Sequence, residues 1–371
     1  MNELNRRQWL RTAGLAGALA TLGGFRNVEI PGESRPAALV NGAARMNFNE
    51  NPYGPSKKVR QAMIDHFDEV CRYPFSFQRE LLSRIAAKHG VPEDHVIITA
   101  GSTEGLRISG LIHGMDEREV ITAELTFFAL SDYAGKVGGI IHKVPLDNAL
   151  QHDLNAMSAK INSNTSLVFI CNPNNPTGAL LPKDQLWDFA KSHAKQATMF
   201  IDEAYFDYIT EPGYPSAVEL VKEGHNVIVS RTFSKVYGLA GIRVGYLIAQ
   251  PELIDKMEGL SMCGPNVLSI FAALEAMSDQ EFYEFSLQKN AHNKNRIYTT
   301  LNQIGLPYQE SHGNFVFFKT GKPIGEVQRA FEARGVLVGR PFPPMLDWCR
   351  VSTGTDEQTL KFAGALREVL G

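Results

Sequence analysis

The feature that most constrains the fold is an alternation, between residues 96 and 248, of short apolar runs and amphipathic stretches. Each apolar run has the length of a buried strand, and helical stretches are expected to begin near Thr103 and Phe127. Strands that alternate with helices predict an α/β fold with a mostly parallel sheet. The predicted strands are VIITA, VITA, GIIHKV, SLVFIC, TMFID, NVIVS and VGYLIA.

The pattern changes after Pro251, where long helical stretches run to about residue 304. The shorter apolar runs FVFF, VLVG and CRVS follow, with helical stretches between and after them, which predicts a smaller α+β domain. A chain of 371 residues also exceeds a single ordinary core. We therefore predict a large domain over residues 71–262, a small domain over 263–371, and a segment over 45–70 that packs with the small domain.

Composition fits a globular enzyme. The chain is 44% hydrophobic and 21% charged with a net charge of −3, so that no strongly basic surface for nucleic acid is expected. None of the four cysteines forms a CxxC pair, and we expect free thiols. The histidines are scattered, and no spacing of His, Cys and carboxylates predicts a metal site.

The first residues differ from the rest of the chain. Arg6 and Arg7 precede an uncharged run of small and apolar residues, 13–24, which is shorter than the about 20 residues of a bilayer span. NRRQWLR resembles the twin-arginine export signal, which directs folded proteins across the bacterial inner membrane. We predict a signal segment over 1–26, a Gly-, Pro- and Ser-rich linker over 27–44 and a periplasmic location. The alternatives are an amphipathic helix that stays attached, and a cytoplasmic protein.

Polar residues follow the strands where several of them end. VIITA runs into Gly101, Ser102 and Thr103 at the expected start of a helix, where hydroxyls and free N–H groups can bind a phosphate. Ser and Thr are also ordinary helix caps, which is the alternative interpretation. SLVFIC runs into NPNNPTG at 172–178, whose Asn and Pro residues can hold an amide rigidly at a strand end, although it could be a plain turn.

Two further strands bring ionisable groups to the same sheet edge. TMFID ends at Asp202, with Tyr205 three residues on, and NVIVS runs into SRTFSK, which ends at Lys235. A buried carboxylate needs a partner, and a Lys among buried neighbours either extends to water or has a covalent task. A ligand that would use all these groups has a phosphate, a phenolic oxygen, a protonated ring nitrogen and an aldehyde. Pyridoxal 5'-phosphate (PLP) has all four.

NPNNPTG, DEAY and SRTFSKVYGLAGIRVGY occur in an order and spacing that resembles the class I/II aminotransferases of PLP fold type I. FNENPYGP at 48–55 and RYP at 72–74 narrow the resemblance to the histidinol-phosphate aminotransferase group. The resemblance extends from about Asn47 to the C-terminus. It implies a large domain with a mostly parallel seven-stranded sheet, a smaller α+β domain and a homodimer.

The resemblance also implies a role for each matched residue. Lys235 would hold PLP as an aldimine and act as general acid and base, and Asp202 would pair with the ring nitrogen. Asn175 and Tyr205 would hydrogen-bond to the phenolic oxygen of PLP. The phosphate would be bound by Ser102, Thr103, Thr232, Ser234, Arg243 and, from the neighbouring subunit of the homodimer, Tyr53.

Three residues would contact the substrate. Arg350, in WCRVSTGT, matches the family's arginine for the substrate carboxylate, a task that suits a bidentate guanidinium; a surface charge is the alternative. Arg340 lies next to the position of the family's second arginine, which contacts the phosphate end of the substrate, and Asn51 is a further candidate. In ELTFF, Phe127 replaces the Tyr that usually stacks on the PLP ring, so that the stacking remains but the hydroxyl is lost.

We predict a PLP-dependent aminotransferase that moves an amino group between an L-amino acid, or a histidinol-phosphate-like amine, and a 2-oxo acid by a ping-pong route through Lys235. One rival is a PLP-dependent decarboxylase of a phosphorylated amino acid. In PLP enzymes the substrate bond held perpendicular to the cofactor ring is the one cleaved, and the placement of Arg350 would decide which bond that is. A second rival is a non-catalytic PLP-binding protein. The sequence leaves the donor and the acceptor open.

Overall fold

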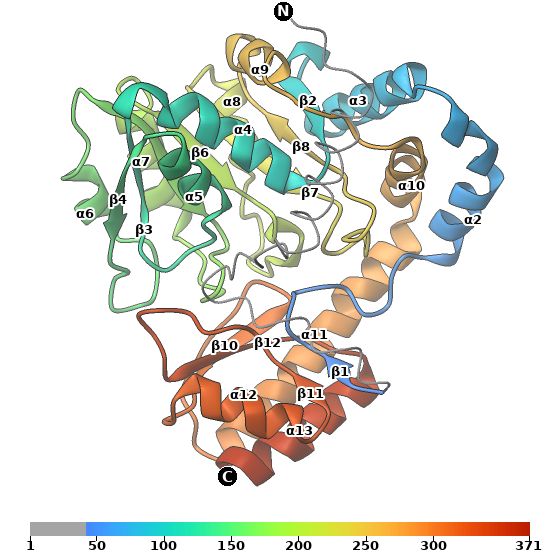
Figure 1. The fold of residues 1–371 in the computed structure, drawn as a ribbon, viewed down its shortest axis with the longest axis vertical. Helices are drawn as coiled ribbons and strands as arrows, with labels where there is room; N and C mark the ends of the chain where they lie inside the picture. Colours follow the sequence, from blue (N-terminus) through green and yellow to red (C-terminus); the bar gives the residue numbers. More distant parts are fainter. Residues whose placement is uncertain (1–41) are drawn as a thin grey trace, which may run out of the picture. The chain divides into compact units, whose positions relative to one another are not determined.

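The computed structural model describes residues 42–371 (Figure 1). The predicted signal segment and nearly all of the predicted linker lie outside these residues. None of the helices within 42–371 is long and apolar enough to cross a bilayer.

A seven-stranded sheet has the strand order β2-β8-β7-β6-β5-β3-β4 (Figure 1). β8 runs antiparallel to its neighbours β2 and β7, and the other four neighbouring pairs are parallel. The predicted α/β class and the seven predicted strands are therefore confirmed. The strands are β2 (Val96–Thr99), β3 (Glu119–Ala123), β4 (Ile140–Val144), β5 (Thr165–Cys171), β6 (Thr198–Asp202), β7 (Val227–Thr232) and β8 (Gly245–Ile248).

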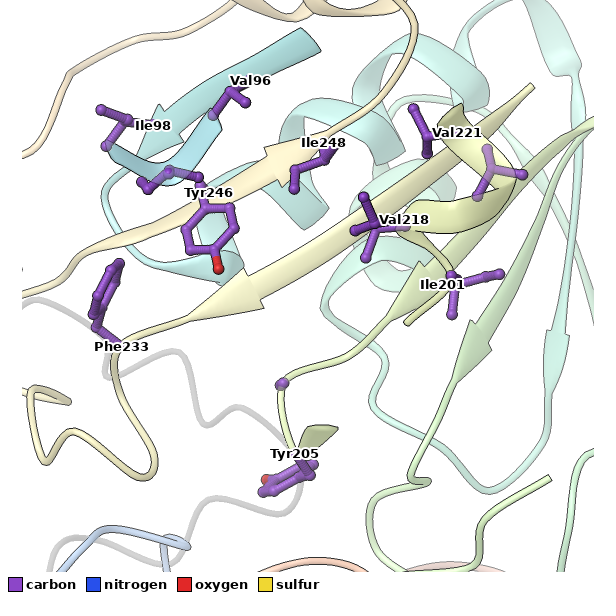
Figure 2. Packing of buried hydrophobic residues seen from close by; sticks show 14 of the residues in the cluster. Val96, Ile98, Ile201, Tyr205, Val218, Val221, Phe233, Tyr246 and Ile248 are labelled. Atoms are coloured by element: carbon purple, nitrogen blue, oxygen red, sulfur yellow. The ribbon is translucent and has the colours of Figure 1, made fainter. Parts of the chain in front are cut away.

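Both faces of this sheet are buried. Along β5, Val168 and Ile170 belong to one cluster of buried apolar side chains, whereas Leu167 and Phe169 belong to another. Since successive side chains of a strand point to opposite faces, the two clusters lie on opposite sides of the sheet. Figure 2 shows side chains of the first cluster. Burial on both faces explains why these strands are continuous apolar runs.

Helices cover each face. Buried side chains of α4 (Ser102–Gly114), α5 (Ala129–Lys136) and α9 (Pro251–Glu258) join the cluster of Phe169. The first cluster, that of Val168 and Ile170, contains side chains from α3 (Phe75–His89), α7 (Lys183–His193), α8 (Val218–Lys222) and α10 (Val267–Ser278). The remaining elements of this part are α2 (Lys57–Asp65), α6 (Leu154–Ser158) and the 3-10 turns η1 (Phe67–Cys71), η2 (Glu93–His95), η3 (Met115–Glu117) and η4 (Phe206–Tyr208).

α5 begins later than the sequence suggests, at Ala129 rather than near Phe127. Thr126 Oγ1 donates a 2.7 Å hydrogen bond to Asn174 Oδ1, and Asn174 Nδ2 donates to Leu125 O at 3.1 Å. These bonds tie the residues after β3 to the NPNNPTG loop, which delays the helix.

A third apolar cluster lies around a three-stranded antiparallel sheet of order β12-β10-β9, which Figure 1 shows. Its elements are β9 (Tyr308–Gln309), β10 (Phe315–Lys319), β12 (Trp348–Ser352), α11 (Gln280–Gln303), α12 (Ile324–Glu332), α13 (Asp356–Leu370) and the parallel pair β1 (Ala44–Arg45) and β11 (Val336–Leu337). The predicted runs FVFF, VLVG and CRVS correspond to β10, β11 and β12, whereas β1 and β9 were not predicted.

The segment after β1 contributes to both cores. Met46 is buried in the third cluster, and its carbonyl accepts a 2.9 Å hydrogen bond from the backbone N–H of Ser352. Val59 of α2 is buried in the first cluster. Residues 46–59 therefore pass from one core to the other.

Candidate active site

Asp202 is the last residue of β6 and is 2% exposed. Its Oδ1 atom has no hydrogen-bond partner among residues 42–371. Burial raises the pKa of this carboxyl to about 6, because a dry environment disfavours the charged form. An acceptor that the chain leaves without a donor is suited to a ligand that brings an N–H group.

Lys235 lies three residues beyond the end of β7. Its Nζ atom donates a 3.1 Å hydrogen bond to the carbonyl of Asn49 and lies 5.2 Å from the centroid of the Tyr205 ring. Burial, and secondly the charge of Arg350, lower the pKa of the amine to about 8. A useful fraction of the amine is therefore neutral near pH 7 and can act as a nucleophile or base.

Tyr205, Asn175 and Arg350 form a connected group beside Lys235. The Tyr205 hydroxyl accepts from Asn175 Nδ2 at 3.4 Å, and Asn175 Oδ1 accepts from Arg350 Nη1 at 2.6 Å. Figure 2 shows Tyr205 apart from the labelled side chains of the strands. Burial raises the pKa of this phenol well above its usual range, so it stays protonated.

Arg350 reaches the site from β12 of the second sheet. Its Nη2 atom donates a 2.8 Å hydrogen bond to the carbonyl of Asn47, while Nε has no partner within residues 42–371. Burial lowers the pKa of the guanidinium to about 10, which leaves it charged at neutral pH. A buried cation with neutral partners is suited to a carboxylate ligand.

Two glycines open a cradle at the start of α4. A Cβ on Gly101, whose φ is 80°, would lie 2.3 Å from Arg243 Nη2, and a Cβ on Gly245 would lie 2.7 Å from the backbone nitrogen of Ser102. Only glycine lets these groups approach so closely. The N-cap residue of α4 is Gly101, which has no side chain to cap the helix, and the Glu104 carboxylate of the first turn accepts a hydrogen bond from the backbone nitrogen of Ala100.

Hydroxyl groups complete this cradle. Ser102 and Thr103 form the first turn of α4, and Thr232 Oγ1 donates a 2.9 Å hydrogen bond to Ser234 Oγ. Thr232 and Thr99 both pair with Gly245, on either side of β8, so the ends of β7 and β2 flank the start of β8. A helix N-terminus, hydroxyls and the Arg243 guanidinium make a site that fits a phosphate.

Both predicted substrate arginines lie close to the Phe342 ring. The Arg340 Cζ atom lies 4.6 Å from the Phe128 ring centroid and 4.4 Å from that of Phe342, and Arg350 Cζ lies 4.9 Å from the same Phe342 ring. Arg340 thus packs on Phe128 and Phe342. Phe127, which precedes Phe128 in the sequence, is instead partly buried against the cluster of Phe169. The predicted ligand contacts of Phe127 and Arg340 stay predictions.

Asn51 and Tyr53 have partners within the chain. Asn51 Nδ2 donates to the carbonyl of Val236 at 2.8 Å, beside Lys235 in sequence. The Tyr53 hydroxyl donates to Asp356 Oδ1 at 3.2 Å. Their predicted roles, in binding substrate and in reaching a neighbouring subunit, stay predictions.

Asn49 was missed by the sequence interpretation although it touches several groups of the site. Its carbonyl accepts from Lys235, and its Nδ2 atom donates a 2.9 Å hydrogen bond to the Tyr205 hydroxyl. Its φ is 54°, a conformation that Asn tolerates better than most residues. The motif FNENPYGP contains this residue, but nothing in its letters distinguishes Asn49 from Asn51.

PLP fits these groups. The unpartnered Asp202 Oδ1 suits a protonated ring nitrogen, the Lys235 amine suits an aldehyde, and the cradle at Gly101 suits the phosphate. Residues 42–371 hold no cluster of three or more His, Cys, Asp and Glu side chains that could bind a metal ion. The four cysteines, all within these residues, are unpaired.

The comparisons with known proteins agree with this fit. The family model described as aminotransferase class I and II matches residues 44–366. A histidinol-phosphate aminotransferase of Caldicellulosiruptor saccharolyticus is 37% identical over 329 residues, which cover 88% of this chain and 91% of that protein. One of Moorella thermoacetica is also 37% identical, over 89% of this chain and 86% of that protein.

A solved structure gives the same result. The histidinol-phosphate aminotransferase of Sinorhizobium meliloti, in complex with pyridoxal 5'-phosphate, superposes with a TM-score of 0.83 and is 26% identical, covering 88% of this chain and 90% of that one. The family match spans most of the chain, including the seven-stranded and the three-stranded sheets. The chain therefore belongs to the aminotransferase class I and II family and is a PLP-dependent aminotransferase.

Proposed function

We propose that Lys235 is the catalytic residue of this aminotransferase and that its donor is an L-amino acid or a histidinol-phosphate-like amine. PLP, when bound, supplies an electron sink for bonds at the substrate's α-carbon. The observation that carries the proposal is the partly buried Lys235 side chain, whose amine bonds to the Asn49 carbonyl and lies 5.2 Å from the Tyr205 ring centroid, with its pKa lowered to about 8 by burial and by the charge of Arg350. Such an amine can both take and return a proton near neutral pH.

The other residues would bind and orient. Asp202 would hold the ring nitrogen's proton, and Asn175 with Tyr205 would bond to the phenolic oxygen. Arg350 would exchange its bonds to Asn175 and Asn47 for the substrate carboxylate. The phosphate would be bound by Ser102, Thr103, Thr232, Ser234 and Arg243, with Phe127 against the ring.

Two observations support a donor with an anionic distal group. The relatives at 37% identity are named histidinol-phosphate aminotransferases. Arg340 Cζ lies 4.4 Å and Arg350 Cζ 4.9 Å from the centroid of the same Phe342 ring, so a second guanidinium lies near the proposed carboxylate site. Asn51 would contact the same substrate from the NPYG segment.

A half-reaction titration tests the proposal. Single donors, histidinol phosphate and aromatic amino acids included, are added to the holoenzyme while the visible band of bound PLP is followed. We expect one donor to bleach the band and a 2-oxo acid to restore it, and the Lys235→Ala variant to show neither change. Release of carbon dioxide without a returned oxo acid would instead identify a decarboxylase. A band that no donor changes would leave a PLP-binding protein.

We propose that the enzyme is a homodimer in which Tyr53 reaches the phosphate of the neighbouring subunit. Large apolar side chains between residues 64 and 75 support a covered surface: Ile64, Phe67, Val70, Tyr73 and Phe75 are 50–85% exposed in the single chain. Light scattering should give twice the chain mass. Tyr53→Phe should weaken PLP binding, and an equal affinity would contradict the shared site.

We also propose export by the twin-arginine route, supported by Arg6 and Arg7 before an uncharged run. The full chain should appear in the periplasm, and replacing both arginines by lysine should keep it in the cytoplasm. The division at about residues 70 and 262 is likewise a proposal. Limited proteolysis of the holoenzyme should cut first near these boundaries.

A further inference from the structure

One short segment contacts both the amine and the guanidinium of the site. The carbonyl of Asn47 accepts from Arg350 Nη2 at 2.8 Å, and the carbonyl of Asn49 accepts from Lys235 Nζ at 3.1 Å. The segment follows directly from Met46, whose carbonyl bonds to Ser352 of β12. The segment is therefore anchored on the three-stranded sheet while it contacts Lys235, which follows strand β7 of the seven-stranded sheet.

Asn49 uses all of its polar groups. Its backbone N–H donates to Ser352 Oγ at 2.8 Å, and the same hydroxyl donates to Asn49 Oδ1 at 2.9 Å. Its Nδ2 atom donates to the Tyr205 hydroxyl at 2.9 Å. Its carbonyl accepts from Asn314 Nδ2 at 3.0 Å as well as from Lys235. The residue is 1% exposed, so these bonds are shielded from water.

The backbone conformation directs the carbonyl. The φ of 54° turns the chain at Asn49, and the Asn49 carbonyl accepts a hydrogen bond from Lys235. Glycine and asparagine tolerate this conformation, whereas alanine is strained in it. A change of side chain at this position can therefore displace the carbonyl.

We infer that Asn49 is a positioning residue, which holds the Lys235 amine through its carbonyl and the Tyr205 hydroxyl through its amide. The inference rests on the proposed function in that Lys235 is taken as the reacting group. Three demands meet at the position: a positive φ, a donor for Tyr205 and an acceptor for Ser352. Asparagine meets all three, glycine only the first, and alanine none.

The carbonyl also affects the proton of the amine. A carbonyl that accepts from an ammonium group favours the protonated form. It therefore opposes burial and Arg350, which both lower the pKa of Lys235. If the carbonyl moved away, the amine would lose its proton at a lower pH.

A matched series of variants tests the inference in the full-length chain. The first measurement is the pH dependence of Lys235 labelling by an amine reagent in cofactor-free protein, read by mass spectrometry of the Lys235 peptide. The second is kcat/KM of the holoenzyme. Asn49→Ala should lower the labelling midpoint by about half a pH unit or more and reduce kcat/KM by about 10²-fold. Asn49→Gly keeps the backbone conformation, so its midpoint should stay at the wild-type value while kcat/KM falls by about 10-fold.

Asp116→Ala is the control, because Asp116 also has a positive φ, of 57°, and is exposed on η3. It imposes the same backbone strain elsewhere and should leave both measurements unchanged. The inference would be overturned if Asn49→Ala had the wild-type labelling midpoint. It would also be overturned if the alanine and glycine variants shifted the labelling midpoint equally. If Asn49→Ala does not fold, a shifted midpoint in Asn49→Gly overturns it. The labelling measurement needs no turnover, so its outcome is independent of whether the donor titration fails.

Discussion

Asp202 and Glu203 are neighbours in the chain, and both are buried, at 2% and 3% exposure. Glu203 accepts hydrogen bonds from Arg231 Nε at 2.7 Å, Ser216 Oγ at 2.7 Å and the backbone nitrogen of Ala217 at 2.6 Å. Asp202 Oδ1 accepts from none of residues 42–371. One carboxylate is completed by the chain, and its neighbour is left incomplete.

The difference separates a structural charge from a functional one. Burial lowers the pKa of the Arg231 guanidinium. The charge of Glu203, with smaller contributions from Tyr246 and Asp207, opposes burial and raises the pKa of Arg231 above its usual value. A buried pair with every hydrogen bond made is stable in place, although it contributes little net stability. Asp202 lies at the end of its strand with one carboxylate oxygen unpartnered among the described residues, and burial raises the pKa of this carboxyl.

The largest effect should come from the amine that faces Asp202. Lys235→Ala should lower kcat by at least about 10³-fold, because nucleophile and proton carrier are lost together. The far-ultraviolet spectrum and unfolding midpoint should remain close to wild type. Lys294→Met is the matched control, since Lys294 is a buried lysine whose amine donates to the carbonyls of Ser311 and Gly313. An active Lys235→Ala variant would contradict the assignment.

The second effect tests the completed carboxylate. Glu203→Gln should destabilise the fold by about 3 kcal/mol, because Arg231 is left with an uncompensated buried charge. Urea denaturation at fixed protein concentration measures this, and kcat of the protein that remains folded should be unchanged. Glu219→Gln is the control, since Glu219 pairs with Lys222 on the surface and should change stability little. An equal loss in both variants would mean that Glu203 is not a buried structural charge.

The incomplete carboxylate should behave in the opposite way. Asp202→Asn should stabilise the cofactor-free protein at pH 7 by about 2 to 3 kcal/mol, the equivalent of raising the pKa from 3.8 to about 6. It should also reduce kcat strongly, because the amide cannot compensate a ring cation. Chemical denaturation with and without PLP measures the first effect. A destabilised cofactor-free variant would contradict the expectation that burying the charged carboxylate costs stability.

The stability difference between Asp202→Asn and the wild type should depend on pH in a direction that the raised pKa determines. Since the pKa of Asp202 is higher in the folded state, the fold binds more protons than the unfolded chain between about pH 4 and pH 6. The contribution of the protonated carboxyl is fully present below about pH 4 and is lost as the pH rises to about 6. The stability advantage of Asp202→Asn should therefore grow across this interval and then level off. A constant difference would contradict a raised pKa.

The comparison also explains what the sequence could predict. Runs such as SLVFIC and TMFID predicted the sheet, because strands buried on both faces need unbroken apolar residues. They placed Asp202 and Lys235 at one edge, because parallel strands end together. They could not separate Asp202 from Glu203, since the partners of Glu203 lie 13, 14 and 28 residues away in the chain. Asn49 was missed for the same reason, as its partners Tyr205 and Ser352 are 156 and 303 residues away.

The smallest effect tests whether the Glu203 carboxylate needs all three of its hydrogen-bond donors. Ser216→Ala removes one of three donors to this carboxylate and leaves Arg231 and the Ala217 nitrogen in place. Because the charge stays paired, we expect a loss of only about 1 kcal/mol in the free energy of unfolding. Urea denaturation measures it, with kcat/KM as the control that should not change. A loss as large as that of Glu203→Gln would mean that the three donors act as one unit. A fall in kcat/KM without a change in stability would mean that Glu203, like Asp202, serves the active site, and the contrast between the two neighbours would no longer hold.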